Sequence, residues 1–147
     1  MKKILLSLAL LVAISAGAAI KPQSIGVYKE YAPMGEFDPY CRLRYNEDNT
    51  FFAFVLKHYE KYDPNVFILE LGTSMDEAAA SILALNRILT TGQKGEMFVL
   101  DEQTTIRKVD KYNMHVYRVG EIDCGLLSKP YLTKSLDFLR QRATNNK

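Results

Sequence analysis

The sequence predicts an exported α+β protein whose single domain contains a largely antiparallel sheet with two helices packed on one face. Three observations carry this prediction. The first twenty residues have the pattern of a secretory signal peptide. Short apolar segments joined by tight turns follow in two runs, and tight turns require antiparallel pairing. Each run ends in a segment with helical apolar spacing, and strands in runs with helices after them indicate an α+β fold.

The amino-terminal segment begins with two lysines, continues as an apolar run and ends in small residues. Ala16-Gly17-Ala18 fits the cleavage rule, so residues 1–18 are predicted to be a signal peptide that is cleaved after Ala18 or Ala19. A retained membrane anchor is the alternative, but the 17 residues 4–20 are fewer than the ~20 that a spanning helix needs. No cysteine lies near the cleavage point. We therefore expect a periplasmic or secreted protein that is not a lipoprotein.

Charge in the remainder of the chain is balanced. Residues 1–20 contain two lysines and no acidic residue, which leaves 17 basic and 17 acidic residues in the predicted domain 20–147. This balance favours neither nucleic acid nor an anionic membrane as a partner. The length suits one globular domain. We expect no cofactor, and a partner, if there is one, among exported or envelope proteins.

The first run of predicted strands spans residues 25–71. Residues 25–31 are the expected first strand, and the segment APMGEFDPY ends it with two prolines and a glycine. Residues 42–45, the turn NEDN and residues 50–57 have the pattern of a hairpin. The second of these strands is apolar enough to lie centrally in a sheet. After the turn KYDPN, residues 66–71 are a further buried strand.

The stretch LELGTSMDEAAAS, residues 69–81, marks the change from strand to helix. Strand, glycine and hydroxyl are also the parts of a nucleophile elbow, but the second glycine of Gly-x-Ser-x-Gly is missing here. Ser74 and Glu77 instead match a capping box, in which each side chain accepts a bond from the other residue's backbone N–H. We therefore predict a capped helix over residues 75–89, with Gly92 at its C-cap.

The second half of the chain has the same predicted order of three strands and a helix as residues 42–89, but without sequence identity to it. Residues 97–100, 104–109 and 114–119 are predicted strands, separated by turns at DEQ and DKYN. Residues 123–130 are predicted to be a loop, and residues 132–142 a short final helix. The expected order is β-βββα-βββα, with about six to seven strands.

Two cysteines, Cys41 and Cys124, are present. An even number in an exported chain favours a disulfide, and two buried free thiols are the alternative. Together with His58 and His115 they do not have the spacing of a zinc site, so no metal site is predicted.

No catalytic motif is found, so we expect a non-catalytic binding or protein-interaction module. Six tyrosines around the first strands form the candidate interaction surface, because tyrosine combines apolar area with a hydroxyl group: Tyr28, Tyr31, Tyr40, Tyr45, Tyr59 and Tyr62. One alternative is a small hydrolase that uses His115 with Cys124 or a carboxylate. Another is an inhibitor or immunity-type protein that acts through the loop APMGEFDPYC, where replacing Met34 to Asp38 would abolish binding.

Overall fold

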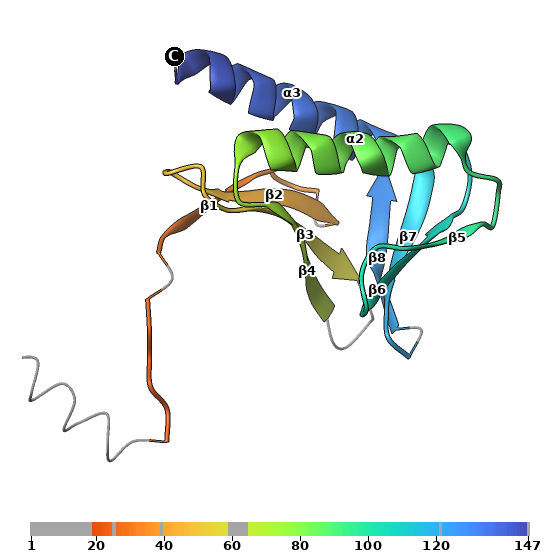
Figure 1. Cartoon of the computed structure of the whole chain (residues 1–147), viewed down its shortest axis with the longest axis horizontal. Coiled ribbons are helices and arrows are strands. Elements are labelled where there is room, and N and C mark those ends of the chain that lie inside the picture. The colour runs from red at the N-terminus through yellow and green to blue at the C-terminus, as the bar shows by residue number, and fades with distance from the viewer. Residues whose placement is uncertain (1–18, 25, 39, 59–64, 121, 147) are drawn as a thin grey trace, which may run out of the picture.

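The structure is a computed structural model that describes residues 19–24, 26–38, 40–58, 65–120 and 122–146. The predicted signal peptide, residues 1–18, lies outside the described residues. Within them the chain has the expected α+β composition, with eight strands and two helices (Figure 1). In chain order these are β1 Tyr28–Tyr31, β2 Cys41–Asn46, β3 Phe52–His58, β4 Asn65–Gly72, α2 Met75–Thr91, β5 Met97–Val99, β6 Thr104–Lys108, β7 Asn113–Arg118, β8 Ile122–Ser128 and α3 Lys129–Asn145.

The strands form two antiparallel sheets rather than the single sheet that we expected. One has the order β1-β2-β3-β4 and the other β5-β6-β7-β8, so each sheet is built from consecutive strands and is followed by one helix. The two sheets are joined by packing, with β8 in contact with β3 and β4. Helices α2 and α3 contact each other and lie along the same side of both sheets (Figure 1). The element order is therefore ββββαββββα.

Strand β8 lies where the sequence predicts a loop, over residues 123–130. Asp123 and Gly125 are of residue types that are depleted in strands. The strand forms by antiparallel pairing with β7, and Gly125 lets its backbone approach β3 of the other sheet closely. Its φ is +135°, and a Cβ added there would lie 3.3 Å from the Cβ of Leu56. Glycine within a strand often marks such a close approach of backbones.

The start of α2 confirms the predicted cap and corrects one of its bonds. Ser74 Oγ accepts a hydrogen bond from the Glu77 N–H at 3.1 Å, as expected. The Glu77 carboxylate, however, accepts from the N–H and hydroxyl of Thr73, at 2.8 and 3.1 Å, and not from Ser74. Gly72 makes this possible, because a Cβ at that position would lie 2.5 Å from the Cβ of Glu77.

The end of α2 lies two residues beyond the predicted end, and Gly92 is its C-cap as predicted. Gly92 N–H donates to the carbonyl of Ile88. The Gly92 carbonyl accepts from Lys108 Nζ at 2.6 Å, so a lysine on β6 places positive charge at the negative end of the helix. Helix α3 is longer than the predicted residues 132–142 at both ends.

One hydrophobic core joins the two halves of the chain. Strand β3 contributes three fully buried side chains to it, Phe52, Phe54 and Leu56, and α3 contributes Leu132 and Leu139. The buried side of α2 consists of Ala78, Ile82, Leu85 and Leu89. Burial of apolar surface of this kind is the main term that stabilises a folded domain. Both sheets and both helices supply side chains to the same cluster.

Candidate functional site

The loop between β1 and β2 presents a large apolar side chain to solvent. Residues 32–38, named here the Phe37 loop, form two successive turns, in which Gly35 N–H donates to the Ala32 carbonyl and Asp38 N–H donates to the Gly35 carbonyl, each at 3.1 Å. Gly35 has a φ of +107°, which glycine adopts without strain. The Phe37 side chain is 98% exposed and the neighbouring Met34 is also exposed.

Hydrogen bonds hold this loop on the sheet. The guanidinium of Arg42, on β2, donates to the carbonyls of Glu36 and Asp38, which flank Phe37. The Asp38 carboxylate accepts from the Tyr40 N–H at 2.9 Å, and the Tyr40 carbonyl accepts from the Lys57 N–H of β3. The exposed Phe37 therefore lies on a braced turn, which lowers the conformational entropy that binding would otherwise cost.

A long-range bond ties the same loop to the far end of the chain. Tyr131, at the start of α3, donates its hydroxyl proton to Asp38 Oδ2 at 2.5 Å. Burial raises the pKa of Tyr131, and the hydrogen bond to Asp38 raises it further, so the phenol remains a proton donor at neutral pH. The orientation of the Phe37 loop thus depends on both halves of the fold.

The six tyrosines that were predicted as an interaction surface do not share one environment. Tyr31 stacks on Phe138 of α3 at a centroid distance of 4.3 Å, and Tyr45 contacts the same ring at 5.3 Å. These two tyrosines are partly buried against α3, so they are not available as an open surface. Tyr28 packs against Phe51, and Tyr40 is exposed. Tyr59 and Tyr62 lie outside the described residues, so for Tyr28, Tyr40, Tyr59 and Tyr62 the surface stays a prediction.

The two cysteines are free and buried, which corrects the expected disulfide. Cys41 lies at the start of β2, next to Leu56 of β3, and Asp38 is close enough to affect its ionisation. The thiol of Cys124, on β8, donates to the Ile122 carbonyl at 3.4 Å. Burial is the main cause that raises the pKa of each thiol. Both therefore behave as small apolar residues rather than as nucleophiles or metal ligands.

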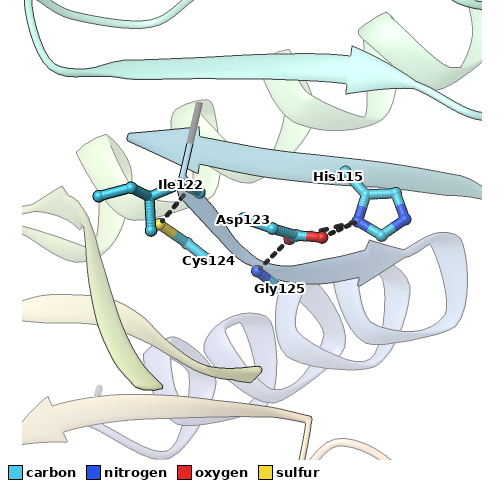
Figure 2. Close-up of polar contacts among 5 residues, drawn as sticks. All are labelled: His115, Ile122, Asp123, Cys124 and Gly125. Carbon is cyan, nitrogen blue, oxygen red and sulfur yellow. Dashed lines mark hydrogen bonds and ion pairs between the residues drawn. The ribbon is translucent and has the colours of Figure 1, made fainter. Parts of the chain in front are cut away.

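His115 meets a carboxylate and not the cysteine. Its Nδ1 lies 3.3 Å from Asp123 Oδ2 and 3.4 Å from Oδ1, and Asp123 Oδ1 also accepts from the Gly125 N–H at 3.0 Å. Figure 2 shows the Cys124 sulfur directed toward Ile122 and away from His115. The carboxylate thus fixes one ring nitrogen of His115.

Neither a metal site nor a membrane-spanning helix is found in the described part of the chain. No group of three or more His, Cys, Asp or Glu side chains gathers there in a way that could hold a metal ion. His58 ends β3, and His115 lies on β7 of the other sheet. Neither of the two described helices is long and apolar enough to cross a membrane.

The Phe37 loop lies within the segment APMGEFDPYC, the alternative binding loop, whereas the sequence predicts the main interaction surface on the tyrosines. The local signal for the loop was an apolar Phe37 between acidic residues, within a segment rich in proline and glycine. An apolar residue in such a turn has no strand or helix face that would bury it. The sequence could not show the hydrogen bond that holds this loop to α3, because Tyr131 and Asp38 are 93 residues apart.

Comparisons with known proteins assign no relative to this fold. The chain matches no protein-family model, no curated protein and no solved structure. Its function must therefore be inferred from the chemistry of its own surface.

Proposed function

We propose that this chain is an exported, non-catalytic protein-interaction module that binds a partner protein through the Phe37 loop. The observation that carries the proposal is the 98% exposure of Phe37 on a turn that hydrogen bonds brace. Aromatic residues, phenylalanine among them, are enriched in protein–protein interfaces relative to the rest of the surface. Bracing the turn in advance means that little ordering is needed on association.

The residues beside Phe37 indicate the chemistry of the partner. Glu36 is exposed next to the ring, and Met34 adds apolar area on the same turn. A complementary surface would offer an apolar pocket for the ring with basic side chains at its rim. Such a contact would suit an inhibitor or immunity-type protein that fills a site on another exported protein. The exported location, predicted from residues 1–18, is part of the proposal.

The experiment places a photoreactive phenylalanine analogue at residue 37 of the full chain, expressed in the cells from which the chain comes. A matched control carries the same analogue at Tyr112, a half-exposed aromatic position in another turn. We expect a discrete cross-linked product from position 37 and none from position 112. The cross-linked protein is then purified and titrated with the unmodified chain and with Phe37→Ala, which should weaken binding by about 2 kcal/mol.

Two results would contradict this proposal. One is equal cross-linking at positions 37 and 112, which would indicate random collision. The other is unchanged affinity of Phe37→Ala for the purified partner, while circular dichroism shows that the variant is folded. Because Phe37 is fully exposed, its replacement should leave the stability of the fold almost unchanged.

The hydrolase alternative rests on the pair formed by His115 and Asp123. A carboxylate on one ring nitrogen orients the imidazole and favours proton transfer at the other. The pairing with Cys124 has no support, because that thiol is buried and bonded to Ile122. Loss of a measured hydrolytic activity in both His115→Ala and Asp123→Asn, with cross-linking from position 37 intact, would favour the enzyme over the proposed module.

A further inference from the structure

A second feature of the surface lies on the sheet β5–β8, away from the core. An open pocket with a volume of about 500 Å³ is lined by residues of β5, β6 and β7 and by the turns that join the strands. The residues used below are Met97, Thr105, Arg107, Tyr117, Arg118 and Val119. Pockets of this size are large enough to hold most of a small organic molecule.

Strand register explains why these side chains gather. Thr105 on β6 is paired with Tyr117 on β7, and Arg107 on β6 is paired with both Met97 and His115. Paired residues of antiparallel strands point to the same side of a sheet, as do alternate residues along one strand. The buried positions Ile106 and Val116 alternate with this set. Thr105, Arg107 and Tyr117 therefore occupy the side that faces away from the core, whereas Arg118 pairs with the buried Thr104 and lies over Phe67.

Arg107 is placed to receive an anion. Its guanidinium lies 5.4 Å from the centroid of the Tyr117 ring, a contact that orients the cation without neutralising it. Among the described residues, no carboxylate forms an ion pair with Arg107 or with Arg118. An unpaired guanidinium presents a planar fork of donors that matches a carboxylate or a phosphate.

The other residues that line the pocket determine which uncharged group the ligand carries beside its anionic group. Met97 and Val119 are exposed apolar side chains, and the Tyr117 ring supplies a flat surface. Thr105 adds a hydroxyl group to the lining. Arg118 lies over the Phe67 ring at 4.7 Å and adds positive charge at the rim, against one acidic residue of the lining, Glu102. The lining is thus cationic and hydrogen-bonding in part, and apolar and aromatic in part.

We propose that this pocket is a binding site for a small organic anion, a carboxylate or phosphate monoester carried on a flat apolar group. Arg107 pairs with the anionic group, Thr105 donates a hydrogen bond to it, and the apolar part packs on Tyr117 and Met97. This site lies on β5–β7, whereas the Phe37 loop joins β1 and β2 of the other sheet. The two proposals can therefore fail separately.

The test is a titration of the purified, isotope-labelled protein, followed by the backbone amide signals in NMR spectra. Phenyl phosphate and benzoate are the two anionic probes, and benzyl alcohol is the neutral probe of similar shape. We expect saturable shifts at Thr105, Tyr117 and Gly120 with the anions, and no saturable shift with benzyl alcohol. Tighter binding of phenyl phosphate would identify phosphate esters as the ligand class, and tighter binding of benzoate would identify carboxylates.

Variants separate a specific site from general attraction to a cation. Arg107→Gln should weaken binding of the tighter anion by at least about tenfold, the scale of one charge-assisted hydrogen bond. Arg107→Lys should retain part of the affinity. Arg87→Gln, which removes an exposed arginine from α2, should leave it unchanged. The proposal is overturned if neither anion gives saturable shifts, if benzyl alcohol binds equally well, or if folded Arg107→Gln binds as the unaltered protein does.

Discussion

At the scale of single residues, burial decides the chemistry of the two thiols. Cys41 is fully buried beside β3, and burial, with a smaller effect from Asp38, raises its pKa. Burial likewise raises the pKa of Cys124, although the neighbouring Arg118 opposes the shift. A thiol with a raised pKa remains protonated at neutral pH and reacts slowly, because the thiolate is the nucleophile.

We therefore predict two unreactive thiols in the folded protein. At pH 7.5 the native chain should react negligibly with Ellman's reagent, and the chain in denaturant without reductant should titrate as two thiols. Cys124→Ser provides the control, since it should titrate as one thiol in denaturant. A disulfide between the two cysteines would instead give no titratable thiol until a reductant is added.

Phe37 and Arg107 differ from the two buried thiols, because their side chains are exposed and can contact a binding partner. Phe37 is 98% exposed, so its apolar ring is hydrated in the free protein at a cost in free energy. Burial of the ring against a partner would remove that cost. A guanidinium without a carboxylate partner among the described residues is likewise available to an external anion. Neither residue is needed for the core, so substitutions at these positions probe binding rather than folding.

At the scale of elements, the Glu77 carboxylate in the first turn of α2 accepts hydrogen bonds from Thr73, in the turn before the helix. The Thr73 N–H and, to a smaller extent, the Thr73 hydroxyl donate to Glu77 and lower its pKa. Because the folded-state pKa lies below the unfolded-state value, ionised Glu77 stabilises the folded state above the unfolded value, about 4.3. That stabilisation disappears as the pH falls through the folded-state pKa.

This gives a prediction that depends on pH. Glu77→Gln should unfold at lower urea concentration than the unaltered protein at pH 7, and the difference should shrink steadily below pH 4. Ser74→Ala is the matched control, because a hydroxyl does not titrate. It should lose about 1 kcal/mol of unfolding free energy at both pH values. An equal effect of Glu77→Gln at pH 7 and pH 3 would show that its charge is not involved.

At the scale of the whole molecule, the two halves are held by the packing of β8 on β3. Gly125 lies at this contact with a φ of +135°, and any added side chain would press on Leu56. Gly120 also has a positive φ, +88°, but nothing lies within 4 Å of the position of its missing Cβ. Comparing substitutions at Gly125 and Gly120 therefore distinguishes the effect of backbone strain from the effect of the close approach of the sheets.

We expect Gly125→Ala to lower the free energy of unfolding by roughly 2–4 kcal/mol, the sum of backbone strain and overpacking. Gly120→Ala should cost roughly 1–2 kcal/mol, from strain alone. Chemical denaturation followed by circular dichroism measures both values. If the two variants lose the same stability, the contact between β8 and β3 does not limit how closely the sheets pack.

The sequence predicts a helix cap or a turn well when the residues that form it are close together in the chain. Ser74 and Glu77 lie three residues apart, and the turn at the end of β2 follows from polar residues that are consecutive in the sequence. The first seven strands and both helices were predicted on such patterns, with shifted ends. The Glu77 bond to Thr73 was not, because it depends on the space that Gly72 leaves.

The sequence by itself determined the α+β class and the alternation of strands with helices, because periodicity and turn residues act over a few positions. Only the tertiary structure decided that the strands form two sheets, that β8 is a strand, and that Cys41 and Cys124 are buried free thiols. It also decided that Tyr131 braces the Phe37 loop and that Arg107 lies beside Tyr117. These features depend on contacts between residues that are distant in the chain or on different strands, and such contacts leave no periodic trace in the sequence.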